Sequence, residues 1–98
     1  MKKLFTAAAA FLAAACFMSC GGKKENIVKI GVYEPASGDN GAGGKQETLG
    51  VQYANQITPT VTIGGKEYKV QLEIVDNESS NDKAVTAASE LISKGVSI

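Results

Sequence analysis

The sequence predicts an α/β fold in which a parallel sheet is flanked by helices and carries one small β-hairpin. Stretches with the apolar alternation of strands take turns along the chain with stretches that have helical periodicity. The first strand has apolar residues on both faces, as expected for a central strand of a parallel sheet. A Gly-Gly pair separates two further strand patterns, which is typical of a hairpin turn.

Residues 1–19 predict a secretory signal peptide rather than a part of this fold. Lys2 and Lys3 supply its positive start, and an apolar run of 15 residues follows over 4–18. A membrane-spanning helix needs about 20 apolar residues, and this run is shorter. A short membrane anchor helix is the alternative interpretation.

The two cysteines, Cys16 and Cys20, both lie at the end of this run, which excludes a disulfide framework in the body. Phe-Met-Ser-Cys at 17–20 and the two glycines after it resemble the lipobox of bacterial lipoproteins. The resemblance implies lipid attachment at Cys20. Cys16 is the second candidate because Phe17 stands where leucine is usual, and cleavage without a lipid is the other interpretation. An acyl chain would anchor the protein at a membrane surface, since burial stabilises by about 0.8 kcal/mol per methylene.

Residues 20–26 are polar and predict a flexible tether, and residues 27–98 form the predicted domain. From Cys20 onward, eight lysines and ten acidic residues give a net charge of −2. The chain therefore has no basic patch for nucleic acid.

The first strand is predicted over residues 27–33, and Pro35 ends it. The first helix is predicted over residues 45–57. Its apolar stripe consists of Leu49, Tyr53 and Ile57, with Ala54 beside them. Gly50 costs about 1 kcal/mol against alanine inside a helix, and we expect it to allow close packing on the sheet.

A hairpin is predicted from residues 61–63, the turn Gly64-Gly65 and the chain from Lys66 onward, and a second long strand follows and ends at Asp76. The second helix is predicted to begin after Ser80, with Asp82 in its first turn and Lys94-Gly95 at its end. Residues 96–98 predict the opening of a third strand. We therefore expect the N-terminal part of a longer protein, poorly folded or aggregation-prone by itself because its strand edges are exposed.

The glycine-rich segment does not match a nucleotide-binding motif. Gly38 lies one residue too far from Gly44 for a P-loop, and Gln46 stands where both that motif and the dinucleotide fingerprint require another residue. The chain has no histidine, so Ser-His and Cys-His catalysis and histidine-containing metal sites are excluded within this sequence. Asp76 and Glu78 are interpreted as solvated or capping groups. The tyrosines are interpreted as packing residues, and no cofactor or metal is predicted.

The favoured interpretation is that the loop after the first strand lines a ligand cleft. In open parallel sheets, ligands bind outside the carboxyl ends of strands. Small residues let a ligand approach the backbone, and N–H groups are available at a helix start. The candidate ligand-binding residues are Ser37, Gly38, Asn40, Gly41, Gly43 and Gly44. The alternative is a flexible loop whose glycines only turn the chain.

Nearly everything after residue 26 resembles the N-terminal lobe of the leucine/isoleucine/valine-binding proteins, the type I periplasmic binding proteins of branched-chain amino-acid ABC transporters. The shared features are the pattern IGV-x-x-P-x-SG from Ile30, two glycines at 44 and 50, the strand end Asp76-Asn77, Lys-Ala-Val at 83–85 and Gly95-Val96. The resemblance implies a two-lobed protein that closes on an amino acid through a hinge, and a first loop, residues 37–44, that touches the ligand. Some members carry an aromatic ring at the position of Gly43, so a leucine-like preference is not implied.

The expected function is therefore an extracytoplasmic, membrane-anchored solute-binding lipoprotein, not an enzyme, that captures an amino acid and delivers it to the membrane permease of an ABC transporter. It would work in the periplasm or on the outer face of the cytoplasmic membrane. A ligand-sensing ectodomain with the same fold is the main alternative, because fold does not fix function. A third hypothesis is an exported α/β enzyme with its catalytic groups elsewhere.

Overall fold

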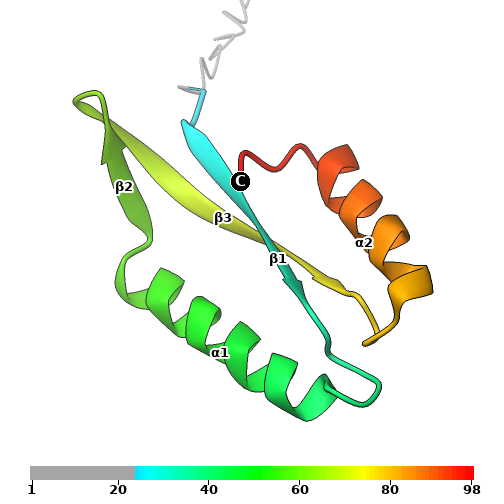
Figure 1. Ribbon diagram of the computed structural model, residues 1–98. Coiled ribbons are helices and arrows are strands. Elements are labelled where there is room, and N and C mark those ends of the chain that lie inside the picture. The colour runs from blue at the N-terminus through cyan, green and yellow to red at the C-terminus, as the bar shows by residue number, and fades with distance from the viewer. Residues whose placement is uncertain (1–23) are drawn as a thin grey trace, which may run out of the picture.

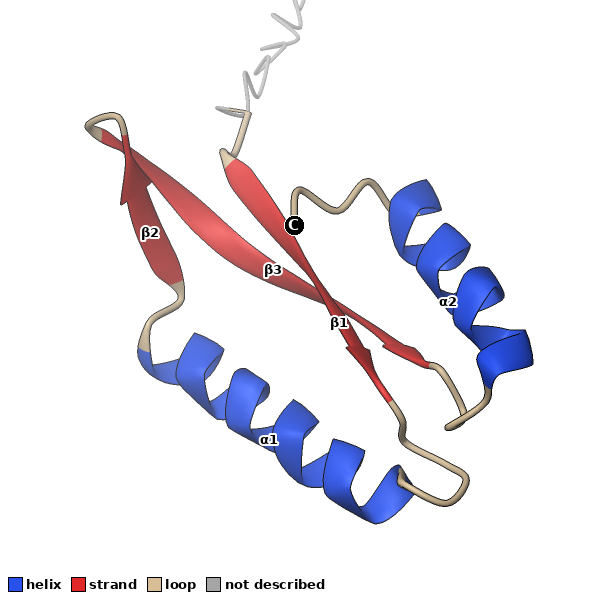
Figure 2. Cartoon of the chain, in the orientation of Figure 1, coloured by secondary structure: helices blue, strands red, loops and turns tan. Residues whose placement is uncertain are grey.

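The computed structural model describes residues 24–98, which form a three-stranded mixed sheet with two helices (Figure 1). The elements, in chain order, are β1 (Ile27–Glu34), α1 (Gly41–Ile57), β2 (Thr60–Ile63), β3 (Lys66–Asp76) and α2 (Asn81–Ser93). Figure 2 shows how the strands and helices alternate. The predicted signal peptide, both cysteines and the start of the tether lie outside the described residues.

The sheet has the order β1-β3-β2, with β1 parallel to β3 and β2 antiparallel to β3. Residues Gly64 and Gly65 form the hairpin turn with φ of 57° and 76°, so the predicted Gly-Gly turn is confirmed. The hairpin strand and the second long strand, predicted as separate pieces, are one continuous strand, β3. The coarse prediction of an α/β fold with a parallel pair and a hairpin is thus confirmed.

The two helices cover opposite faces of the sheet (Figure 1). The main buried cluster lies under α2 and consists of Val75, Ala87 and Leu91, with Val96 packed against it. Gly31 of β1 belongs to this face, where a Cβ atom would lie 3.2 Å from Cδ1 of Leu91. The missing side chain therefore lets α2 approach the sheet closely.

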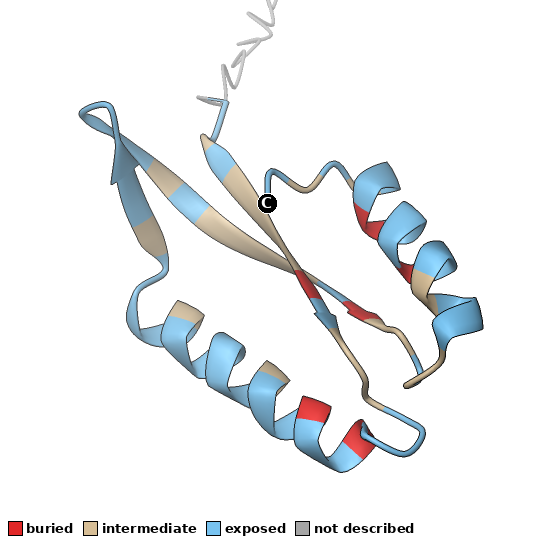
Figure 3. Ribbon diagram, in the orientation of Figure 1, coloured by how far each residue is buried: buried red, intermediate tan, exposed pale blue. Residues whose placement is uncertain are grey.

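Helix α1 begins at Gly41, four residues before the predicted start at Lys45. Its buried residues are Gly41 and Gly44, at the end nearest the sheet's loops (Figure 3). A Cβ on Gly44 would collide with the carbonyl oxygen of Pro35, so glycine is required there for α1 to meet the end of β1. This contact between distant residues outweighs the poor helix propensity of the glycines.

The predicted apolar stripe of α1 is exposed rather than packed: Leu49 is 56%, Tyr53 65% and Ile57 62% exposed. The interpretation of Tyr53 as a packing residue is therefore wrong, because most of its side chain is exposed. Gly50 also has nothing within 4 Å of a built Cβ, so its predicted packing role is wrong as well. The physical reason is that α1 meets the sheet through its first turn, and a hollow of about 560 Å³ separates its later turns from the strands.

Helix α2 follows Ser80 as predicted, with Asp82 in its first turn, although the Ser80 hydroxyl makes no capping hydrogen bond. Gly95, at φ 71°, ends it. Residues 96–98 are not assigned to a strand. The Ser97 N–H nevertheless donates to the Lys29 carbonyl at 2.7 Å, and the Gly31 N–H donates to the Ile98 carbonyl at 2.8 Å. These bonds lie along the edge of β1 that faces away from β3.

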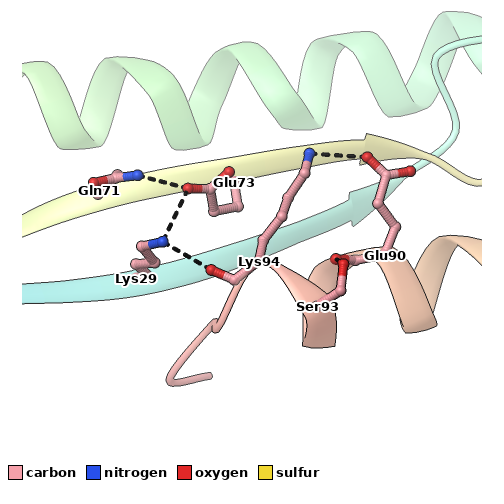
Figure 4. A network of polar contacts seen from close by, with 6 residues as sticks. All are labelled: Lys29, Gln71, Glu73, Glu90, Ser93 and Lys94. Atoms are coloured by element: carbon pink, nitrogen blue, oxygen red, sulfur yellow. Dashed lines mark hydrogen bonds and ion pairs between the residues drawn. The ribbon is translucent and has the colours of Figure 1, made fainter.

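A polar network links β1 and β3 to the end of α2 (Figure 4). Lys29 forms an ion pair with Glu73 at 3.8 Å and donates to the carbonyl of Lys94 at 2.8 Å. Gln71 donates to the same Glu73 carboxylate at 2.6 Å. Glu90, one turn before Lys94, pairs with it at 2.9 Å and raises its pKa. The network fixes the end of α2 on the strands.

Candidate functional site

The candidate site lies where β1 and β3 end side by side. Glu34 is the register partner of Asp76, so the two parallel strands stop at the same edge of the sheet. The loops of residues 35–40 and 77–80 leave this edge together (Figure 1). Ligands of open α/β sheets bind at such carboxyl ends.

The carboxylate of Asp76 joins the two loops. It accepts the N–H of Ala36 at 2.7 Å, the hydroxyl of Ser37 at 2.7 Å and the N–H of Glu78 at 2.8 Å. These hydrogen bonds favour the charged form, with the Ala36 N–H as the largest cause, and hold the pKa of Asp76 below its ordinary value of 3.8. Asp76 is therefore a loop-holding anion.

Ser79 makes a second connection between the loops. Its hydroxyl donates to the carbonyl of Ser37 at 2.8 Å and accepts the N–H of Asn40 at 3.0 Å. Its own N–H donates to Oδ1 of Asn77 at 3.1 Å. Ser79 thus holds the first loop at two points, Ser37 and Asn40.

The second loop has an unusual backbone. Glu78 and Ser79 are consecutive non-glycine residues with φ of 56° and 55°, a region that L side chains rarely adopt. Gly38 of the first loop, at φ 76°, faces them, and a Cβ there would lie 2.9 Å from the Cβ of Ser79 and would collide with the Glu78 carbonyl. The two loops fit only because residue 38 is glycine.

The structure gathers the six predicted ligand-binding residues in one segment but divides them by exposure (Figure 3). Ser37, Gly38 and Asn40 lie in the exposed loop. Gly41 and Gly44 are buried, Gly44 against Pro35. Three of the predicted residues are thus accessible to a ligand, and Gly44 instead provides the contact through which α1 packs on Pro35.

Two hollows flank this segment. One, of about 320 Å³, lies on the α2 side. Most of its lining residues carry hydroxyl or amide groups, and Pro35 and Ala84 add apolar surface: Tyr33, Pro35, Asn40, Asn77, Ser79, Ser80, Asn81 and Ala84. The other, of about 360 Å³, lies on the α1 side and includes Gly43 and three carboxyl groups: Glu34, Asp39 and Glu47. Asn40 borders both hollows, so the loop forms the ridge between them.

Glu34, at the end of β1, has a pKa raised above its ordinary value of 4.5. The main cause is a hydrogen bond with the carboxyl group of Glu47 on α1, and desolvation and the repulsion between the two carboxylates add to it. With Asp39, these two groups place three carboxyl groups on the α1 side of the loop.

Sequence reasoning identified the first loop but missed the residues that hold it. Asp76 was interpreted as a solvated or capping group, and it does accept the N–H of Glu78 two residues on. Its bonds to Ala36 and Ser37 span 40 and 39 positions, and no local pattern marks Ser79 as a partner of the first loop. The available signal was an aspartate as the last residue of a strand, beside the end of a parallel neighbour.

Within residues 24–98, no group of three or more His, Cys, Asp or Glu side chains is arranged to hold a metal ion. Neither helix of this part of the chain has the length and apolarity needed to cross a bilayer. The described chemistry consists of hydroxyl, amide, carboxylate and backbone groups, which suit the recognition of a small polar molecule.

Comparisons with protein-family models, with curated proteins and with solved structures find no match to this chain.

Proposed function

We propose that this protein is an extracytoplasmic solute-binding lipoprotein that captures an amino acid, of the branched-chain type or related to it, for an ABC transporter. In this proposal, residues 27–98 belong to the N-terminal lobe of a type I periplasmic binding protein. Cys20 carries the lipid, and residues 20–26 tether the domain to the membrane.

One observation carries the proposal: the loops after two adjacent parallel strands are tied into a single unit at the carboxyl edge of the sheet. Asp76 and Ser79 supply this connection. The edge is the ligand-binding position of open α/β sheets. The hollow of about 320 Å³ beside it is near the lower end of the roughly 300–1,000 Å³ range of small-molecule pockets.

The chemistry of the two hollows also supports an amino acid. Hydroxyl and amide side chains on the α2 side, other than the hydroxyl of Ser79, offer hydrogen-bond donors for a carboxylate. The carboxyl groups on the α1 side suit an ammonium group. The residues of the ridge between them, Ser37 and Asn40, are exposed. A small ligand can therefore reach the backbone of the loop.

The test is calorimetric titration of the complete gene product with a panel of branched-chain, acidic and amide amino acids. We expect saturable binding of at least one of them. The absence of heat across the whole panel, with a protein shown to be folded by circular dichroism, would contradict the proposal.

The lipid anchor needs a separate test, which uses the two cysteines as a matched pair. In cells fed a labelled fatty acid, Cys20→Ala should abolish incorporation and Cys16→Ala should leave it unchanged. Equal labelling of the wild type and Cys20→Ala would exclude Cys20 as the attachment site.

A further inference from the structure

We infer that Asp76 and Ser79 are positioning residues, which hold the loop of residues 35–40 in its ligand-accepting form without contacting the ligand. The inference rests on the proposed function and adds to it the residues on which affinity depends. It is carried by five hydrogen bonds of these two side chains, four of them with the first loop and one with the second.

Ser79 has no hydrogen left for a ligand. A serine hydroxyl has one proton to donate, and Ser79 donates it to the carbonyl of Ser37 at 2.8 Å. One of its lone pairs accepts the N–H of Asn40 at 3.0 Å. Because the hydroxyl both donates a hydrogen bond to the first loop and accepts one from it, its role is to fix that loop.

Asp76 is occupied in the same way. One carboxylate oxygen accepts the N–H groups of Ala36 and Glu78, at 2.7 and 2.8 Å, and the other accepts the hydroxyl of Ser37 at 2.7 Å. These donors come from both loops, so Asp76 fixes the first loop relative to the second.

The second loop is itself held in a strained shape. Two consecutive residues at positive φ, Glu78 and Ser79, persist only where the surroundings determine them, and Asp76 accepts the N–H of one of them. This shape is what aims the Ser79 hydroxyl at the first loop. The ordering of residues 35–40 is then completed before a ligand arrives, and binding does not bear that entropic cost.

The first experiment compares two serine variants that undergo the same chemical change. Ser79→Ala removes both loop contacts, and Ser89→Ala removes a hydroxyl that donates to Val85 on the exposed face of α2. Calorimetry of the complete protein, well below its Tm, should show that Ser79→Ala weakens amino-acid binding by roughly tenfold, the scale of two lost hydrogen bonds. Ser89→Ala should bind as the wild type does. Unchanged affinity in Ser79→Ala overturns the inference.

The second experiment separates positioning from direct contact at Asp76. Asp76→Asn keeps an oxygen for the N–H groups of Ala36 and Glu78 and can pair its amide with Ser37, whereas Asp76→Ala loses all three bonds. We expect Asp76→Asn to stay within a few-fold of the wild type and Asp76→Ala to lose roughly tenfold or more. Equal losses of affinity in the two variants would mean that the ligand contacts the charged carboxylate of Asp76 directly, which overturns the inference.

Amide hydrogen exchange without a ligand distinguishes this inference from the proposed function. In Ser79→Ala the Asn40 amide should exchange faster than in the wild type, and in Asp76→Ala the Ala36 amide should do so. If the wild type binds no amino acid but these amides are protected by the two side chains, the proposed function fails and the loop-holding role stands. If the amides exchange equally in all variants, the inference fails whatever the wild type binds.

Discussion

The carboxylate of Asp76 accepts the backbone N–H of Ala36 at 2.7 Å, so one hydrogen bond joins two chain positions that are 40 residues apart. Asp76 is the last residue of β3, and Ala36 lies two positions after the end of β1. The parallel register brings them together. The local sequence around either residue does not reveal this contact, although the position and shape of the candidate site depend on it.

Acid should weaken this contact. Because the pKa of Asp76 is lowered in the folded protein, the unfolded chain binds the proton more readily. The stabilisation is therefore complete above the ordinary value of 3.8 and is lost as the pH falls through the lowered folded pKa. Urea titrations of the wild type and Asp76→Asn over acid pH should give free energies of unfolding that converge as the pH falls. A difference between the two proteins that stays constant with pH would contradict this assignment.

Gly44 should be essential for the docking of α1, and Gly50 should not. A Cβ at position 44 would collide with Pro35, so we expect Gly44→Ala to lower the free energy of unfolding by about 1–3 kcal/mol, as overpacking does. Gly50 has open space around it, so Gly50→Ala should raise the free energy of unfolding by up to about 1 kcal/mol through helix propensity. Denaturant titration of both variants measures the contrast. A stabilised Gly44→Ala would show that α1 does not rest on Pro35.

These two glycines show which features of the fold can be predicted from the sequence and which depend on contacts between distant residues. Features set by neighbouring residues were predictable: the Gly64-Gly65 turn, the α2 start after Ser80 and the stop at Gly95. The start of α1 was not, because glycines argue against a helix and the contact that requires Gly44 comes from β1. Apolar periodicity identified a helix over residues 45–57 but could not tell that its stripe is exposed.

In the candidate site, too, the part set by local sequence was predictable and the part set by distant contacts was not. The glycine-rich loop was predictable because its composition marks a strand end followed by a helix start. The partners of that loop were not, because Asp76 and Ser79 reach it only through the parallel pairing of β1 with β3. The strained φ of Glu78 and Ser79 has no sequence signature either, since neither is a glycine.

Leu91 should carry much of the stability of the described domain. Only 7% of it is exposed, and it joins Val75 and Ala87 in the buried cluster. Leu91→Ala should lower the free energy of unfolding by about 2–5 kcal/mol. Its neighbour Ile92 is 73% exposed, so Ile92→Ala should change the free energy by no more than about 0.5 kcal/mol. Thermal and urea unfolding measure both variants, and similar losses would contradict the packing of α2 on the sheet through Leu91.

The carboxyl pair of Glu34 and Glu47 should give the opposite pH dependence to Asp76. The pKa of Glu34 is raised by its hydrogen bond with Glu47, so the folded protein holds this proton more firmly than the unfolded chain does. The favourable contribution is complete below the ordinary value of 4.5 and is lost as the pH rises through the raised folded pKa. Above it, two carboxylates face each other between β1 and α1.

Glu47→Gln removes one of these charges and leaves an amide that can still hydrogen-bond to Glu34. We expect this variant to be more stable than the wild type at neutral pH. The difference should shrink as the pH falls through the raised pKa of Glu34 towards 4.5, and as salt screens the pair. Glu67→Gln, on the exposed hairpin, removes the same charge away from the carboxyl pair, serves as the matched control and should gain less stability at neutral pH than Glu47→Gln does. Urea unfolding at several pH values and two salt concentrations measures both. An equal gain in the two variants would trace the effect to net charge alone and remove the carboxyl pair as its cause.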